Sequence, residues 1–260
     1  MKIQNYQRKC YHTYKSEIGY PEHFTYIGGC PVKVHIPIET ALKKVMIVDA
    51  YPSAKFFTVE TPEGKIPDTP MEDHNSPFST ETYFDGSRLR TNLFGQELNE
   101  VILHKIGVKR EDCWLTDLVK VFLFKPRHLK RYRKLGKTDI SPNRHKFMEY
   151  AWASLPFLHD EIEICKPYVV ILLGQEVVQA FFQISATKAL GYMDGTVKKF
   201  EVRGRKRNII CVPHPGILMK KTSKNRWPER FEGKIALNAH EEIKRIRPGM
   251  SEPAQSDGSD

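Results

Sequence analysis

Four short runs of apolar residues stand out along the chain. They cover residues 45–48, 113–116, 169–173 and 208–212, and each is rich in β-branched or aliphatic side chains. A strand that is buried on both faces of a parallel sheet has this continuous pattern, whereas a half-exposed strand alternates apolar and polar residues. The pattern therefore predicts four buried parallel strands.

Helical patterns lie between these runs. Apolar residues recur at helical spacing from residue 94 to residue 102 and again from residue 177 to residue 182. A third helix is predicted over residues 147–164, because the following Lys166-Pro167 step disfavours helical backbone. Strands that alternate with helices indicate a three-layer α/β/α sandwich with a central four-stranded parallel sheet.

The length of 260 residues suits one α/β domain with a single large core. We expect this domain to span residues 1–247, with residues 1–40 as an extension of unclear role and residues 248–260 as a disordered tail. There is no apolar run long enough to span a membrane and no secretory signal at the amino end. The five cysteines form no Cys-x-x-Cys pair, which argues against a disulfide framework and indicates a reducing, cytoplasmic setting.

The positive charge of the chain indicates a polyanionic partner such as nucleic acid. The chain has 41 Lys and Arg against 31 Asp and Glu, a net charge of +10, and the excess is concentrated in residues 125–137, 198–207 and 220–226. In residues 125–137, seven of thirteen side chains are basic and none is acidic. Such clusters fit a groove that follows phosphates, although a solvated surface is the alternative.

Polar residues follow each predicted strand. Residues 49–53, 117–120, 174–175 and 213–216 come directly after the four runs. The carboxyl ends of parallel strands meet at one edge of a sheet, which is where open α/β sheets bind ligands. We expect these residues to form one site, although any one of them alone could be a cap or a turn residue.

The order of these motifs resembles the uracil-DNA glycosylase superfamily. The spacing is most similar to the bacterial and archaeal branches of the family 4 and family 5 type, and the matching segments are residues 45–53, 84–89, 114–120, 166–174 and 212–218. The resemblance implies an enzyme that flips a nucleotide out of DNA and hydrolyses its N-glycosidic bond without a cofactor. This chain lacks the paired cysteines that hold an iron–sulfur cluster in those branches, so we predict that it binds no metal.

The resemblance also implies roles for individual residues. His214 matches the histidine that donates to the base oxygen, and Gly216 stands where serine is common and would approach a phosphate through its backbone. Ile217 and Leu218 match the wedge that fills the gap left by the flipped base. Phe84 matches the aromatic platform under the base. The alternatives are a histidine that satisfies a loop carbonyl and apolar side chains that face the core.

The first motif departs from the family pattern. The family places a carboxylate or an amide one or two residues before the motif proline, where this chain has Ala50 and Tyr51. The nearest acid is Asp49, which we take as the candidate for positioning water, with Asp85 as a further catalytic candidate. Tyr51 is then a candidate base contact.

Asp117 is the second departure, because the family reads the base with asparagine at this position. An ionised carboxylate accepts hydrogen bonds but cannot donate one. Three alternatives follow: burial protonates Asp117, the preferred base is not uracil, or Asp117 has become catalytic. A capping aspartate is the structural alternative.

The sequence therefore favours a monomeric DNA base-excision glycosylase, associated with the nucleoid if bacterial, that acts on uracil or another deaminated base. The alternative is an inactive nucleic-acid-binding protein on the same scaffold. A nucleotide-using enzyme fits poorly, because neither Gly-x-Gly-x-x-Gly nor a P-loop motif is present. Besides the wedge and Gly216, the predicted DNA contacts are Ser53, Lys120, Arg127, Lys130, Arg131 and Arg133.

Overall fold

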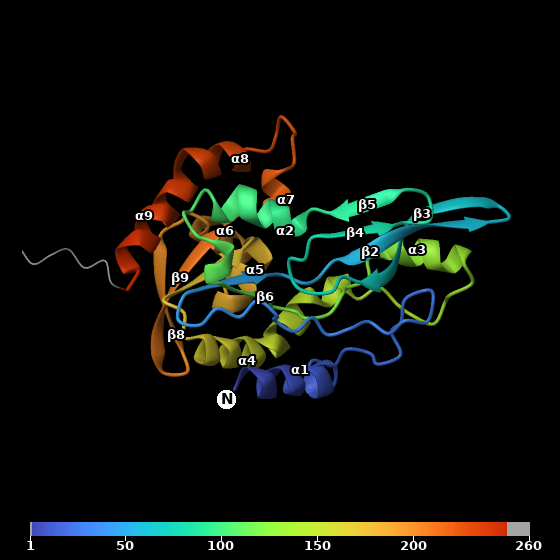
Figure 1. Ribbon diagram of the computed structural model, residues 1–260, viewed down its shortest axis with the longest axis horizontal. Helices are drawn as coiled ribbons and strands as arrows, with labels where there is room; N and C mark the ends of the chain where they lie inside the picture. Colours follow the sequence, from blue (N-terminus) through green and yellow to red (C-terminus); the bar gives the residue numbers. More distant parts are fainter. Residues whose placement is uncertain (1, 249–260) are drawn as a thin grey trace, which may run out of the picture.

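The computed structural model describes residues 2–248, and its centre is a five-stranded sheet (Figure 1). The strand order is β6-β1-β7-β9-β8, in which β1, β6, β7 and β9 are parallel and β8 is antiparallel to β9. The strands are β1 (Val45–Asp49), β6 (Cys113–Asp117), β7 (Val169–Leu173), β8 (Val197–Val202) and β9 (Arg205–Val212). The four predicted strands are the four parallel ones, and the predicted strand count was one too low. The edge strand β8 was missed because its side chains alternate in exposure and include lysines, a pattern typical of sheet edges.

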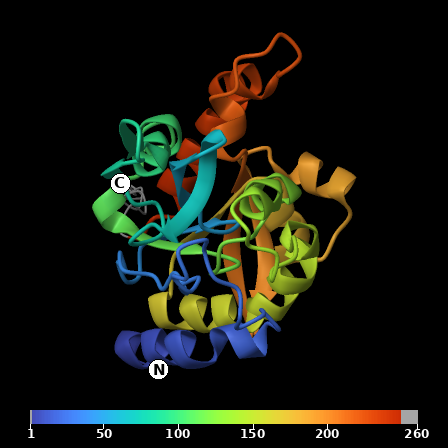
Figure 2. The ribbon, with the colours of Figure 1, turned by 90° about the vertical axis from the view of Figure 1, so that its right-hand side faces the viewer.

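Helices cover both faces of the sheet, which confirms the three-layer sandwich (Figures 1 and 2). Successive strand residues point to opposite faces, so Met46 and Val48 join one core whereas Val45 and Ile47 join the other. The first core is covered by α1 (Ile3–Glu17), α4 (Phe147–Cys165), α5 (Gln175–Phe182) and α6 (Ala186–Tyr192). The second is covered by α2 (Phe94–Glu97), η1 (Leu98–Leu103), η4 (Phe231–Ile235) and α9 (Ala236–Ile246).

The amino-terminal helix α1 packs on α4, below the sheet in Figure 1. The Tyr6 hydroxyl donates to Glu161 Oε1 over 2.5 Å, and the Tyr14 hydroxyl lies 2.6 Å from Ser154 Oγ. Both tyrosines are fully buried. The first part of the predicted extension is therefore bonded into the same core as the sheet.

Two hairpins and one helix extend from the sheet toward the right of Figure 1. The hairpins are β2 (Ala54–Thr61) with β3 (Gly64–Asp73) and β4 (Glu81–Phe84) with β5 (Leu89–Asn92), and the helix is α3 (Pro126–Lys134). Helix α3 carries most of the basic stretch 125–137 and is fixed to β3, because the Tyr132 hydroxyl donates to the Pro70 carbonyl over 2.5 Å. These segments follow the carboxyl ends of β1 and β6, so they stand beside the predicted site.

The remaining short elements connect these layers: η2 (Arg110–Asp112), η3 (Arg144–Lys146), α7 (Pro215–Leu218) and α8 (Trp227–Arg230). Within residues 2–248, no helix combines the length and the apolar character that crossing a membrane requires. Most of the predicted disordered tail, residues 249–260, lies outside the described residues.

Candidate active site

Two carboxylates and an imidazole meet at the carboxyl edge of the sheet. Asp49 ends β1 and Asp117 ends β6, and the two are direct partners in the parallel register. His214 follows β9 and caps the amino end of α7. Both aspartates are buried, because they lie between the two helical layers. The sequence analysis expected these three residues to share one edge, and the structure brings them together there.

The orientation of His214 is fixed by its neighbours. The Gly216 backbone N–H donates to His214 Nδ1 over 2.9 Å, so the proton of the neutral ring sits on Nε2. Nε2 lies 3.3 Å from Asp49 Oδ1. Gly174, which has a φ of 86°, allows this approach, because a Cβ there would stand 3.0 Å from the His214 Cβ. The imidazole thus lies within ion-pair distance of a buried carboxylate, and Asp49 Oδ1 has no hydrogen-bond partner among the described residues.

We expect the pair of Asp49 and His214 to stabilise the fold in a pH-dependent way. Burial lowers the pKa of His214, but the carboxylates of Asp49, Glu97 and Glu176 together raise it by more, with Asp49 first among them, so the pKa lies above the ordinary 6.5. A raised pKa means that the folded state binds the proton more tightly. The contribution is therefore complete below about pH 6.5 and is lost as the pH rises through the folded pKa of His214.

Thermal unfolding of the wild type and of His214→Gln checks this expectation. The wild type should lose its advantage in melting temperature over the variant as the pH rises above about 6.5 and passes through the folded pKa of His214. A difference in melting temperature that does not change with pH would contradict the ion pair.

The surroundings of Asp117 favour the protonated form of its carboxyl. Burial raises its pKa well above the ordinary value, the nearby Asp49 charge raises the pKa further, and the Lys120 ammonium offsets only part of this. Among the described residues, Asp117 Oδ2 has no hydrogen-bond partner. A protonated carboxyl can both donate and accept, as an amide does.

Lys120 does not lie where a phosphate could reach it, which corrects its prediction as a DNA contact. Its side chain is fully buried, and Nζ lies 2.5 Å from Glu161 Oε1. Nζ also donates to Thr116 Oγ1 over 2.6 Å and to the Asp117 carbonyl over 2.9 Å. A buried lysine needs such partners, so Lys120 supports the end of β6 from inside the protein.

A cavity of about 580 Å³ opens beside Asp49 and His214. Tyr51, Ser53 and Gly216 line it, as the sequence analysis expected for a shared site. Tyr51 is fixed in place, because its hydroxyl accepts a hydrogen bond from Arg144 Nε over 2.9 Å. Asp117 lies instead on a small adjoining space of about 20 Å³, and Ser53 and Phe94 border both spaces.

Three rings form a stack at the boundary of these spaces. The Phe94 ring lies between Phe78, at 5.1 Å between centroids, and His214, at 5.4 Å. Both pairs are close to parallel, with interplanar angles of 9° and 21°. Phe94 therefore packs against two other rings, so a base that stacks on it competes with these contacts. Phe94 was not predicted as a site residue, because it begins a helical pattern that places it on the core face of that helix.

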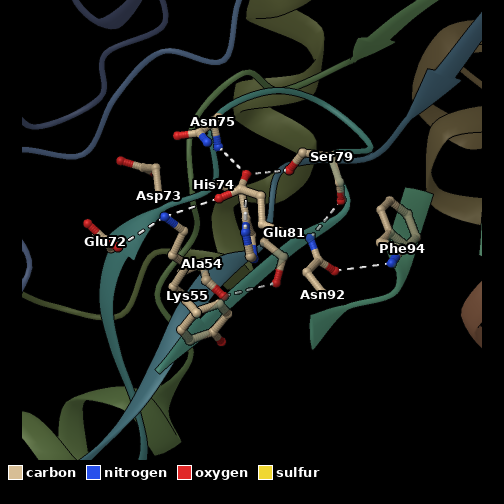
Figure 3. A network of polar contacts seen from close by, with 12 residues as sticks. Ala54, Lys55, Glu72, Asp73, His74, Asn75, Ser79, Glu81, Asn92 and Phe94 are labelled. Atoms are coloured by element: carbon tan, nitrogen blue, oxygen red, sulfur yellow. Dashed lines mark hydrogen bonds and ion pairs between the residues drawn. The ribbon is translucent and has the colours of Figure 1, made fainter. Parts of the chain in front are cut away.

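A polar network from the hairpins positions Phe94 (Figure 3). Asn92 Oδ1 accepts from the Phe94 N–H over 3.1 Å, and Asn92 Nδ2 donates to the Ser79 carbonyl over 3.1 Å. Ser79 Oγ in turn donates to Glu81 over 2.7 Å, and Lys55 Nζ lies 3.1 Å from the same carboxylate. The network connects both hairpins to the ring beside His214.

Phe84 and Asp85 lie apart from this site, at the tip of the β4–β5 hairpin. Phe84 is 58% exposed and does not line the cavity. Asp85 is buried and accepts from the backbone N–H groups of Ser87 and Arg88, both over 2.8 Å, so it closes the hairpin turn. The structure therefore does not bring either residue to the edge of the sheet.

A family model described as the uracil DNA glycosylase superfamily matches residues 63–234. The chain belongs to this superfamily. The matched stretch includes Asp117 and His214 and begins after Asp49, in agreement with the departure seen in the first motif.

One related protein supports the assignment to the superfamily. The Type-4 uracil-DNA glycosylase of Pyrobaculum aerophilum is 29% identical over 129 residues. The aligned stretch covers 49% of this chain and 57% of that protein's length. The chain thus spans just over half of this relative.

The residues of this superfamily member do not fit an iron–sulfur cluster. Cluster ligands are thiolates that converge on one centre, whereas Cys10, Cys113, Cys165 and Cys211 are buried in four separate elements, α1, β6, α4 and β9. Within residues 2–248, no group of three or more His, Cys, Asp or Glu side chains could hold a metal ion.

The two residues of the predicted wedge differ in exposure. Ile217 is 38% exposed and lines a separate pocket of about 210 Å³ that also reaches His214, whereas Leu218 is 8% exposed and belongs to the second core. On α3, Arg127 lines the cavity, Lys130 and Arg133 are exposed, and Arg131 lies 3.7 Å from Asp68. Of the two wedge candidates, only Ile217 presents an apolar side chain to solvent.

Proposed function

We propose that this protein is a DNA glycosylase that hydrolyses the N-glycosidic bond of uracil or of another deaminated base flipped out of DNA. The observation that carries the proposal is the buried Asp49 facing the His214 N–H at the edge of a cavity. Membership of the uracil DNA glycosylase superfamily supports the same reaction class. The basic residues of α3 and the exposed Ile217 supply phosphate contacts and a wedge.

The chemistry assigns a separate role to each group. The bond from C1′ of the sugar to the base breaks, and its electron pair leaves with the base. The His214 N–H donates to a base oxygen and stabilises the developing anion. When a base oxygen accepts the hydrogen bond from His214 Nε2, the Asp49 carboxylate no longer pairs with that nitrogen. Asp49 can then accept a proton from the water that adds to C1′.

Assays of base release test the proposal. Oligonucleotides holding uracil, hypoxanthine or xanthine are incubated with the protein and then treated with alkali, which cleaves the strand at abasic sites. We expect strand cleavage for at least one base. Folded protein that binds these oligonucleotides and releases none of the bases would support the inactive binding protein instead.

Asp117→Asn should raise kcat/KM on uracil by about tenfold, which is within the range of one properly paired buried hydrogen bond. The amide pairs with both uracil N3–H and O4 at every pH, whereas the acid pairs only while it holds its proton. The gain should therefore grow as the pH rises. An identical substrate profile in both proteins would mean that residue 117 does not contact the base.

A further inference from the structure

One wall of the cavity is built by the hairpins and by the segment that leads into α3, away from the strand ends. We call this the hairpin wall, and its residues are Phe56, Tyr83, Phe122, Lys125, Arg127 and His128. The cavity of about 580 Å³ falls in the range that holds a whole drug-sized ligand. A single pyrimidine ring bound at Asp49 and His214 fills only part of such a space.

The hairpin wall is aromatic and well fixed. Phe122 and His128 are stacked, with 5.5 Å between centroids and 20° between planes. Phe56 packs against His128 at 5.6 Å and against Phe122 at 6.4 Å. The Phe56 N–H donates to the Tyr83 hydroxyl over 3.0 Å. Phe122 and His128 are buried within the wall, so the half-buried rings of Phe56 and Tyr83 offer the surface to a ligand. Exposed aromatic rings bind nucleobases by stacking without regard to sequence.

His128 supplies a hydrogen-bond donor that has no acceptor. The residue is only 1% exposed, and its Nδ1 accepts a hydrogen bond from the Lys125 N–H over 3.1 Å. Burial and then the Arg127 and Lys125 charges lower the pKa of His128 to about 3, so the ring is neutral and its proton sits on Nε2. Among the described residues, Nε2 has no partner. Buried donors without partners are rare, and a ligand oxygen would satisfy this one.

Two cations of the hairpin wall are also unpaired. Within residues 2–248, neither Lys125 nor Arg127 forms an ion pair with a carboxylate. Arg90, which lines the same cavity, is different, because Asp68 and Asp85 neutralise it. An anion is therefore expected at Lys125 and Arg127, beside the aromatic rings.

We propose that the hairpin wall is a second nucleotide subsite, which holds the base and the phosphate of a nucleotide adjacent to the flipped one on the same strand. The inference rests on the proposed function, because it takes the flipped base to lie at Asp49 and His214. A single strand offers two adjacent unstacked nucleotides at little cost, whereas a duplex must open a second base pair. The substrate class is therefore single-stranded DNA.

Fluorescence anisotropy tests the subsite without requiring catalysis. Wild-type protein is titrated into a labelled single-stranded oligonucleotide with one uracil, and into two others in which the 5′ or the 3′ neighbour is an abasic linker that keeps its phosphate. Loss of one neighbouring base should weaken binding by about 5- to 100-fold, the effect of losing one stacked base. The matching duplex should bind more weakly than the single strand. Equal affinity for all three single strands overturns the proposal.

Two variants with matched controls locate the effect. Phe56→Ala should abolish the difference between the oligonucleotides, whereas Tyr11→Ala, which removes an exposed ring on α1 outside the cavity lining, should keep it. Arg127→Ala should weaken binding of every single strand, whereas Arg8→Ala on α1 should not. Because Arg127 is exposed, its variant tests the subsite even if Phe56→Ala fails to fold. Wild-type behaviour of folded Phe56→Ala and of Arg127→Ala would reject the assignment.

The subsite and the proposed function fail separately. Binding that depends on the neighbouring base, without any base release, keeps the subsite and rejects the glycosylase. Base release together with binding that is independent of the neighbouring base keeps the glycosylase and rejects the subsite.

Discussion

His214→Ala should slow base release by about 10²–10³-fold, which is the usual effect of removing one donor that stabilises a developing anion. The variant loses the Nε2 that lies 3.3 Å from Asp49 Oδ1 at the edge of the cavity. Two other histidines, His74 and His128, line the same cavity, but neither forms an ion pair with Asp49 within residues 2–248. Single-turnover rates on a uracil oligonucleotide measure the chemical step directly. Affinity for the same oligonucleotide should change little, because the phosphate contacts remain.

A matched histidine variant separates this effect from general damage. His145→Ala removes an exposed imidazole outside the cavity lining and should release base at the wild-type rate. Circular dichroism of both variants reports whether the fold is intact. A decrease in the rate of base release of less than tenfold in folded His214→Ala would mean that His214 does not stabilise the leaving base.

Asp49→Asn should reduce the single-turnover rate by about 10²–10⁴-fold, the range for loss of a general base. Asparagine keeps the size of the side chain but removes the charge that would accept a proton from water. Asp112→Asn is the matched control, because Asp112 lies just before the opposite end of β6 and pairs with Lys44 away from the cavity. Equal rates for Asp49→Asn and the wild type would mean that Asp49 is not the general base for the attacking water.

The same variant has a second readout. Because the Asp49 carboxylate raises the pKa values of both His214 and Asp117, each pKa should fall in Asp49→Asn. Titration of the His214 imidazole by nuclear magnetic resonance measures the first shift. An unchanged pKa of His214 in the variant would mean that the two groups are not in contact in solution.

The buried strands and the edge where they end could be predicted from sequence, because continuous apolar runs have one common interpretation in an α/β protein. Asp49, Asp117 and His214 follow such runs directly, so their convergence needed only the parallel arrangement of the strands. The hairpins between β1 and α2 were not predicted. Their residues form one wall of the cavity, and no periodic pattern specifies how an insertion folds back over a site.

Phe84, Phe94 and Lys120 show where sequence patterns were insufficient. Phe84 follows the family order of motifs, but an inserted hairpin carries it into solvent. Phe94 has the spacing of a core residue, although its ring lies against His214. Lys120 stands next to a basic stretch, and its burial depends on Glu161, a partner from a distant helix that local sequence does not reveal.

The stack of Phe78, Phe94 and His214 bears on what happens after the reaction. A base that occupies this position takes the place of a contact between rings that the free protein already makes, so the gain from stacking is only the difference between the two. When the cleaved base departs, the rings close on each other again. Free uracil should therefore be a weak product inhibitor, and turnover should be limited by dissociation of the abasic DNA and not by escape of the base.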